Sequence, residues 1–255
     1  MEFVPGVYGA PPPDVTGRNV VLVDFSYKRP VMEALCRNAA SVIVLDHHKT
    51  AAEELDGLAA PQENPIAVIV TIDMEKSGAV LAWEHFHPGQ PIPRLLQHVQ
   101  DRDLWHFALP GTREISACIF SYAFEMARWD WLAAEIERDP TAILAEGTAI
   151  ERMHHKNVAE LLRTSTRTMT IAGHRVPVAN LPFTLASDAG NVLCRGTLDG
   201  AAPPFAGIYY DRPRGRSFSL RSIGDFDVSA IAKRYGGGGH RNAAAFTMPL
   251  GWEGE

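Results

Sequence analysis

The sequence predicts an α/β protein in two parts. Continuous runs of β-branched residues alternate with segments of helical spacing in the first half, a pattern typical of parallel strands covered on both faces. The second part instead alternates apolar and polar residues around turn signals. We therefore expect a parallel-sheet domain with helices on both faces, joined by a long helix to a smaller mixed α/β domain.

Three apolar runs define the expected parallel strands. They are NVVLVDF (19–25), SVIVL (41–45) and IAVIVTI (66–72). Helical spacing follows at 29–39 and at 77–86. After Pro93 the chain is expected to be helical to about Arg163, and the periodic stretch that follows Pro140 is a natural link between domains. The expected organisation is a first domain at 1–140, a linker helix at 141–165 and a C-terminal domain at 166–255.

Short strands are expected in the C-terminal part. Residues 167–181 alternate around Gly173 and His174, which indicates a hairpin. Further strands are predicted at NVLCRGTL (191–198), PFAGIYY (204–210) and GRSFSLRSI (215–223). A helix at 227–236 is expected to run into four glycines.

Composition excludes several classes of protein. The 255 residues are 46% hydrophobic and 21% charged, which is ordinary for a globular chain. No uncharged run exceeds the 12 residues from Val176 to Ser187, whereas a membrane span needs about 20. The N-terminus has no basic cap, so no signal peptide is expected. The three cysteines include no CxxC pair, which favours a reducing compartment and a cytoplasmic location.

Charge is distributed unevenly along the chain. Residues 1–154 hold 12 Lys and Arg against 22 Asp and Glu, and residues 155–255 hold 12 against 8. The difference indicates metal chemistry in the first part and anion capture in the second, or simply two differently solvated surfaces. Long duplex DNA is not expected as a partner, because the net charge is −6.

Acids and histidines follow two of the expected strands. Asp24 ends the first, and Asp46 ends the second, directly before His47 and His48. Ligands bind at the carboxyl ends of parallel strands, and imidazole and carboxylate are ligands for divalent cations. We therefore expect these side chains to share a crevice. The other pair, His154–His155, is expected to be a chance surface dipeptide.

Further acids are weaker candidates for the same crevice. Asp101 and Asp103 close a helical segment; alone they would indicate a solvated helix end, but beside the first cluster one of them is a plausible metal carboxylate. Asp73 is expected more as a helix-entry residue before Ser77 than as a ligand.

The run GGGGHR is the main signal of the second part. Consecutive glycines are costly to order, so packing is not expected to explain them. They suit a backbone that approaches a ligand closely or presents N–H groups to an anion. The non-functional alternative is a flexible linker. The candidate substrate-binding residues are Gly237, Gly238, Gly239, His240 and Arg241, with Arg221 on the preceding strand.

Together these segments resemble the DHH phosphoesterase superfamily with its associated C-terminal domain. VDFS (23–26), LDHH (45–48) and QDRD (100–103) are similar to its second, third and fourth motifs, and SLRS (219–222) and GGGGH (236–240) to its C-terminal domain. The resemblance implies a phosphoesterase that uses two manganese ions in a cleft between domains. Family members cleave short oligonucleotides, bisphosphorylated adenosine, cyclic dinucleotides, pyrophosphate or polyphosphate; GGGGH favours the nucleotide-handling members.

The resemblance also implies roles for individual residues. Asp24, His47 and Asp101 would be metal ligands, Asp46 would orient His47, and His48 would face the phosphate. In the C-terminal domain, His240, Arg221 and the glycine backbone would hold the substrate. Two Mn(II) ions would activate a water and stabilise in-line displacement.

The family's first motif, a strand followed by a histidine and two aspartates, has no counterpart here. Only 23 residues precede Asp24, and they hold one aspartate, Asp14, and no histidine. We therefore expect a misplaced start or a truncated gene. Such a chain would hold at most one cation well, and its sheet would be left uncovered, which favours self-association.

The expected function is that of a phosphoesterase of short oligonucleotides or small nucleotides. The alternatives are a non-catalytic nucleotide-binding protein and an inorganic polyphosphate or pyrophosphate phosphatase.

Overall fold

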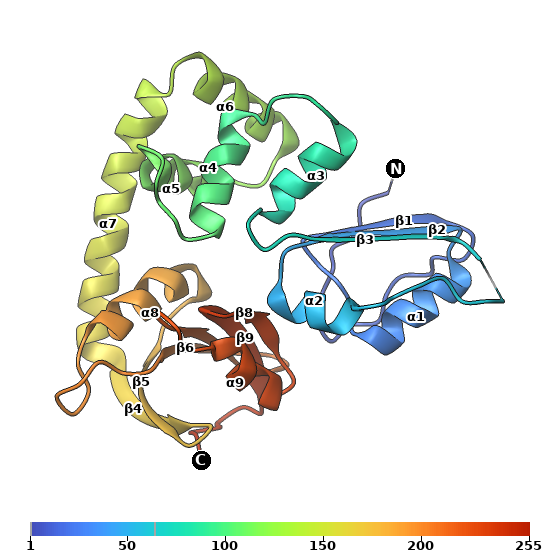
Figure 1. The fold of residues 1–255 in the computed structure, drawn as a ribbon. Helices are drawn as coiled ribbons and strands as arrows, with labels where there is room; N and C mark the ends of the chain where they lie inside the picture. The colour runs from blue at the N-terminus through green and yellow to red at the C-terminus, as the bar shows by residue number, and fades with distance from the viewer. Residues whose placement is uncertain (1, 64) are drawn as a thin grey trace. The chain divides into compact units, whose positions relative to one another are not determined.

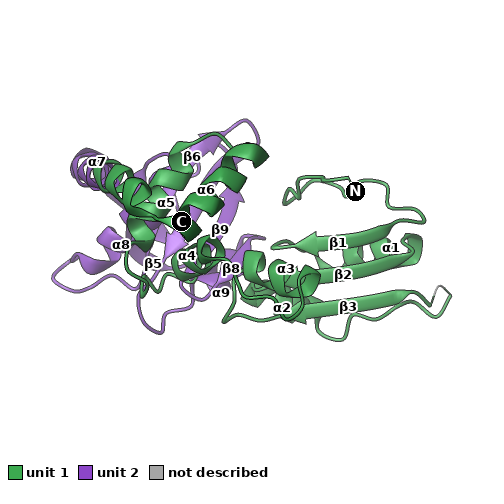
Figure 2. Cartoon of the chain, turned by 90° about the horizontal axis from the view of Figure 1, so that it is seen from above, with its two compact units in different colours: residues 1–150 green, residues 151–255 purple. Residues whose placement is uncertain are grey.

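The computed structural model describes residues 2–63 and 65–255. Contacts divide the chain into two compact units, residues 1–150 and residues 151–255 (Figure 2). The boundary falls inside the 25-residue helix α7 (Thr141–Ser165), which leads from one unit into the other (Figure 1). No helix within the two described ranges combines the length and the apolar content that crossing a bilayer requires.

The first unit begins with a three-stranded parallel sheet in the order β1-β2-β3. Its strands are β1 (Asn19–Val23), β2 (Ser41–Asp46) and β3 (Ala67–Ile72). The connecting helices are α1 (Arg29–Asn38), which has Pro30 in its first turn, and α2 (Lys49–Leu55). All three strands therefore end at one edge, and the acids that follow them are brought to that edge. The parallel α/β class expected from the sequence is confirmed.

One face of this sheet is covered more completely than the other. Val42 and Val44 are fully buried beneath α1 and α2, with neighbours from β1 and β3. On the opposite face Val21, Val23 and Ile69 are exposed, and α3 (Gly78–Phe86) contacts β1 and β2. The expectation of helices over both faces therefore holds for only part of the sheet, because alternate residues of β1 and β3 point to solvent.

The rest of the first unit is helical, as the sequence predicts after Pro93. It contains α4 (Arg94–Asp103), α5 (Thr112–Ser121), α6 (Met126–Arg138) and the start of α7. Their core includes Ile115, Cys118, Leu132 and Ile136. This bundle fixes the end of α4, where the QDRD segment lies.

The second unit is a six-stranded mixed sheet in the order β4-β5-β6-β7-β9-β8. The strands are β4 (Thr166–Ile171), β5 (His174–Asn180), β6 (Ala206–Arg212), β7 (Gly215–Arg221), β8 (Gly238–His240) and β9 (Ala243–Met248). The predicted hairpin joins β4 to β5 through Ala172 and Gly173, which both have positive φ, as a two-residue hairpin turn requires. A helix, α9 (Val228–Arg234), precedes β8 as expected.

The expected strand at 191–198 is wrong. Residues 191–195 belong to α8 (Ala186–Arg195), which follows a 3-10 turn, η1 (Phe183–Leu185). Ala186, Ala189, Gly190 and Cys194 are buried along one side of α8, so its apolar residues recur with helical spacing. Taken alone, the run NVLC resembles a strand, and only the residues before it reveal the helical period.

Candidate metal and phosphate site

Asp24 is held at the carboxyl edge of the sheet by its backbone. Its N–H donates to the carbonyl of Leu45 at 2.8 Å, and its φ is +56°, a left-handed conformation that aspartate tolerates better than most residues. Its side chain is half exposed. The first residue of α3, Gly78, makes room for it, because a Cβ there would lie 2.5 Å from the Asp24 Cβ.

Asp46 is completely buried at the end of β2. Its Oδ1 accepts hydrogen bonds from the backbone N–H groups of His47 (2.7 Å) and His48 (3.1 Å) and contacts the His48 Nδ1 at 2.7 Å. Its Oδ2 has no hydrogen-bond partner among the described residues. Burial opposes ionisation, but the His48 ring and these N–H groups hold the Asp46 pKa below its ordinary value. A buried carboxylate oxygen without a partner is costly unless something binds it.

The aspartate of the DHH sequence orients the second histidine ring. We expected Asp46 to orient His47; its carboxylate bonds instead to the His48 ring and only to the backbone of His47. Because the ionised carboxylate accepts, the His48 Nδ1 donates this hydrogen bond. Asp46 thus fixes the orientation of the His48 ring.

His47 lies between two other carboxylates. Its Nε2 is 3.0 Å from Asp24 Oδ1 and 3.4 Å from Asp103 Oδ2, and the side chain is 2% exposed. Burial lowers the His47 pKa, but Asp24 and Asp103 outweigh it and hold the pKa above its ordinary value. One imidazole nitrogen and two carboxylates therefore converge on one point.

The structure places Asp101 and Asp103 in different roles. The Asp101 carboxylate accepts from the N–H groups of Ala108 (2.8 Å) and Leu109 (3.0 Å) and from the Thr112 hydroxyl (2.6 Å). Although burial opposes ionisation, these bonds hold the Asp101 pKa below its ordinary value. Asp101, our sequence-based choice of ligand, thus organises the loop between α4 and α5. Asp103, the alternative, faces His47.

Asp73 also organises a loop. Its Oδ1 accepts from the Glu75 N–H at 3.0 Å, and its N–H donates to the carbonyl of Asp46. Ser77 caps α3 by accepting from the Val80 N–H. This agrees with the interpretation of Asp73 as a helix-entry residue.

The donor set of this edge fits a divalent cation. One donor atom from each of Asp24, Asp46 and His48 lies within 4.8 Å of the other two, while His47 and Asp103 adjoin Asp24. Mixed carboxylate and imidazole donors suit manganese or zinc. A bound cation would also explain why Asp46 Oδ2 has no hydrogen-bond partner within the part of the chain that the structure describes.

Gly78 is a site residue that the sequence analysis missed. The signal that could have revealed it is a small residue directly after the helix cap Ser77.

In the second unit, Arg221 is partly buried beside α8. Its guanidinium donates to the carbonyl of Leu220 and to the Ser187 hydroxyl, both at 2.8 Å, and Gly190 leaves space for its stem. Burial lowers the pKa of Arg221 to about 10, so the side chain remains a cation at neutral pH. A desolvated cation with few partners is a strong attractor for an anion.

The glycines of GGGGH have a packing role that we did not expect. A Cβ at Gly237 would lie 2.0 Å from the carbonyl of Ala245, and one at Gly239 would lie 2.5 Å from that of Ala243. Gly236 and Gly239 also have positive φ. The expectation that packing does not explain these glycines is therefore wrong for Gly237 and Gly239: they let β8 lie against β9. Gly238 and His240 belong to β8, and Arg241 pairs with the exposed Asp225 at 3.3 Å.

The histidine pair of α7 is engaged in ordinary contacts. His154 Nε2 lies 3.0 Å from Asp188 Oδ2, so it ties α7 to α8, and His155 Nε2 lies 2.9 Å from Glu151. His154 is partly buried, in contrast to the surface dipeptide we expected.

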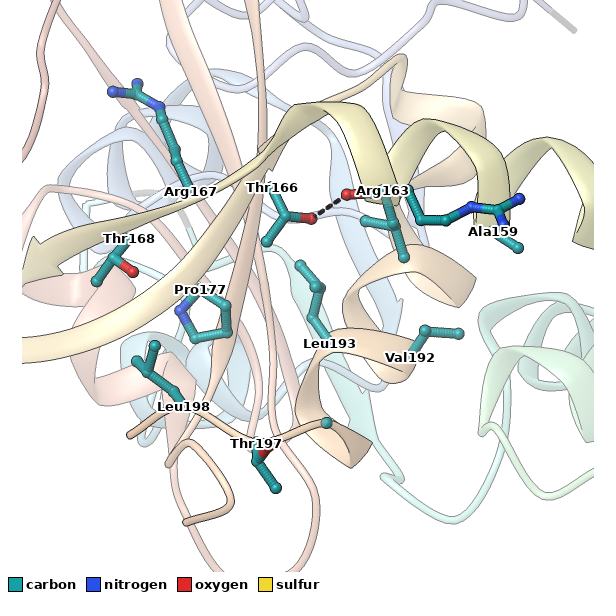
Figure 3. A pocket seen from close by; sticks show the side chains of 12 residues that line it. Ala159, Arg163, Thr166, Arg167, Thr168, Pro177, Val192, Leu193, Thr197 and Leu198 are labelled. Atoms are coloured by element: carbon teal, nitrogen blue, oxygen red, sulfur yellow. Dashed lines mark hydrogen bonds between the residues drawn. The ribbon is translucent and has the colours of Figure 1, made fainter. Parts of the chain in front are cut away.

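A hollow of about 620 Å³ is also present in the second unit (Figure 3). It lies among the end of α7, β4, β5 and the end of α8, and its charged lining residues are Arg163 and Arg167. Arg167 also bonds to Glu253 and to the Tyr209 hydroxyl. None of the site residues proposed from the sequence lines this hollow.

Comparisons with known proteins find a curated relative and solved structures that are similar to this chain. No family model matches the chain. The chain is 31% identical over 240 residues to the uncharacterized protein R106 of Acanthamoeba polyphaga mimivirus, with 92% of this chain aligned. It spans about half the length of that curated relative, 54%.

Among solved structures, the chain resembles the DHH domain of a member of a family of ribosomal proteins. The TM-score is 0.54 at 14% identity, over 91% of this chain and 66% of the other. The two chains share a fold. An exopolyphosphatase-related protein from Bacteroides fragilis (TM-score 0.40, 14% identity, 89% and 65% covered) and a pGpG-specific phosphodiesterase from Vibrio cholerae (0.37, 13%, 92% and 94%) are more distant matches.

Proposed function

We propose that this protein is a metal-dependent phosphoesterase that hydrolyses short oligonucleotides or small nucleotides. The observation that carries the proposal is the gathering of carboxylates and imidazoles at one edge of the sheet. Donor atoms of Asp24, Asp46 and His48 lie within 4.8 Å of one another, and His47 adjoins both Asp24 and Asp103. One oxygen of the buried Asp46 has no hydrogen-bond partner among the described residues. A DHH-type fold supports the proposal.

Each residue has a proposed part in the reaction. Asp24, Asp46, Asp103 and His47 would hold manganese, which would supply charge neutralisation and an activated water. His48, oriented through Nδ1 by Asp46, would contact the phosphoryl group or its water through Nε2.

The second unit would supply the anion-binding groups. Arg221, His240 and Arg241 are cationic or hydrogen-bonding groups of the part of the chain with excess positive charge. A guanidinium binds a phosphate through two parallel hydrogen bonds. We propose that these residues hold a terminal phosphate or nucleotide, and that the glycine backbone of β8 approaches it.

Hydrolysis assays with a panel of substrates test the proposal. The chelator-treated protein is assayed with and without manganese on a dinucleotide, adenosine bisphosphate, a cyclic dinucleotide and pyrophosphate. Manganese-dependent cleavage of at least one nucleotide, lost in His47→Ala and retained in His155→Ala, is the expected result. Cleavage of pyrophosphate alone would favour the inorganic alternative, and no cleavage of any substrate would reject the proposal.

A further inference from the structure

Three aromatic rings lie together beside the acid and histidine site of the first unit. Tyr8 and Phe25 have ring centroids 4.7 Å apart at 46°, and Phe25 meets Tyr27 edge-on at 4.8 Å. Phe25 directly follows Asp24 in the chain. The outermost of these rings, Tyr8, is 69% exposed. A large ring that remains exposed at the margin of a polar site is not explained by core packing.

The segment that carries Tyr8, residues 2–18, is held in place by contacts at both ends and in its middle. Arg18 pairs with Glu2 at the ends of the segment, and the Gly17 N–H donates to the carbonyl of Asn38 at 2.8 Å. In its middle, Gly6 lies flat on Phe25, because a Cβ there would be 2.7 Å from that ring. The segment therefore presents Tyr8 over Phe25.

The chemistry of the site decides what such a surface would bind. The face of an aromatic ring carries partial negative charge, so it gives a phosphate no favourable contact. The Tyr8 phenol is neutral at physiological pH, because a tyrosine side chain ionises only near pH 10 or above. A flat, neutral, exposed ring suits stacking with a nucleobase, and such stacking tolerates any base sequence.

We propose that Tyr8, supported by Phe25, is a stacking platform for a base of the substrate. The inference rests on the proposed function and narrows it: the platform would favour phosphate esters that carry a nucleobase over inorganic pyrophosphate or polyphosphate. It also gives the N-terminal segment a role in recognising the substrate.

Fluorescence of a dinucleotide that contains 2-aminopurine tests the platform without turnover. Stacking quenches 2-aminopurine, so titration is followed in the presence of chelator with wild type, Tyr8→Phe, Tyr8→Leu and the matched control Phe124→Leu, an exposed ring that packs near Trp129. We expect wild type, Tyr8→Phe and the control to quench equally. Tyr8→Leu, which keeps an apolar contact with Phe25, should bind roughly 5- to 100-fold more weakly.

The outcomes separate this inference from the proposed function. Equal affinity of Tyr8→Leu and wild type, or no quenching by wild type, overturns the platform. Competition by pyrophosphate for the dinucleotide site gives a second measurement. The pyrophosphate affinity should be the same in Tyr8→Leu and wild type. If Tyr8→Leu lost affinity equally for the dinucleotide and for pyrophosphate, the variant would have a general structural defect, and the inference would be overturned. Quenching through Tyr8 without manganese-dependent hydrolysis of any substrate would reject the enzyme but keep the platform, as part of a nucleotide-binding protein.

Discussion

Asp46 Oδ1 lies 2.7 Å from His48 Nδ1, whereas Nε2 of the adjacent His47 faces Asp24 at 3.0 Å. Two neighbouring histidines are thus coupled to different carboxylates through different ring nitrogens. His48 is oriented by a buried acid. His47 lies between Asp24, which follows β1, and Asp103, which ends α4. In the proposed enzyme the two rings would therefore have separate roles: His48 would face the substrate, and His47 would gather metal ligands.

The two acids of QDRD should respond differently to substitution. Asp103→Asn should weaken manganese binding and turnover with little loss of stability, because desolvation raises the Asp103 pKa and so disfavours the charge that is removed. Asp101→Ala should cost about 1–3 kcal/mol of unfolding free energy, since it leaves the N–H groups of Ala108 and Leu109 without their acceptor. Urea unfolding and manganese calorimetry on both variants check this. Loss of metal binding in Asp101→Ala at full stability would restore Asp101 as the ligand.

Gly78→Ala should harm the site and destabilise the fold. The added Cβ would lie 2.7 Å from Asp24 Oδ1, so Asp24 must move and the metal affinity should fall. The nearest atom to the added Cβ is the Asp24 Cβ, at 2.5 Å, and overpacking of this kind costs about 1–3 kcal/mol. The preference for alanine over glycine in a helix offsets at most about 1 kcal/mol of this cost. We therefore expect weaker manganese binding and lower turnover together with a lower melting temperature. Wild-type metal affinity in this variant would contradict the placement of Asp24 against α3.

The sheet and the position of its acids could be predicted from the sequence, because the strand runs 19–25, 41–45 and 66–72 are continuous and the acids follow them directly. The choice between Asp101 and Asp103 could not. The two lie two residues apart at the end of α4, and what separates them is a loop whose N–H groups fold back onto Asp101. The spacing of residues in the sequence does not predict that the loop folds back onto Asp101.

The glycine run shows a second limit of sequence reasoning. Glycines at 236–239 were expected to serve a ligand, whereas Gly237 and Gly239 are required by the approach of β8 to β9. Both explanations demand the absence of a side chain, so the residue type alone cannot distinguish them. The partner strand lies only a few residues further along the chain, but its register is fixed by the tertiary fold.

Gly237→Ala is therefore expected to act on stability first. Its Cβ would lie 2.0 Å from the Ala245 carbonyl, and overpacking of this kind costs about 1–3 kcal/mol. Gly224→Ala is the control: it has positive φ but open space around it, so it should lose only the cost of the left-handed backbone, about 1–2 kcal/mol. Hydrogen exchange should show faster exchange at β8 and β9 in Gly237→Ala and at the control site in Gly224→Ala. Full protection of β9 in Gly237→Ala would mean that the strands are not held this closely.

The carboxylates around His47 predict a specific dependence of metal binding on pH. Without metal, Asp24 and Asp103 hold the His47 pKa above its ordinary value of 6.5, so their pairing stabilises the folded protein fully below pH 6.5 and the stabilisation is lost as the pH rises through the higher folded pKa. A metal needs the deprotonated ring, and manganese must therefore displace a proton in this pH range. Calorimetric titrations in two buffers of different ionisation enthalpy should detect that proton near pH 6.5. The manganese affinity should fall about tenfold per pH unit below the His47 pKa.

In Asp103→Asn this fall in manganese affinity should begin at a lower pH, because one of the charges that raises the His47 pKa is gone. Proton release that is unchanged in His47→Gln would show that another group titrates, and would exclude His47 as the ligand that manganese deprotonates.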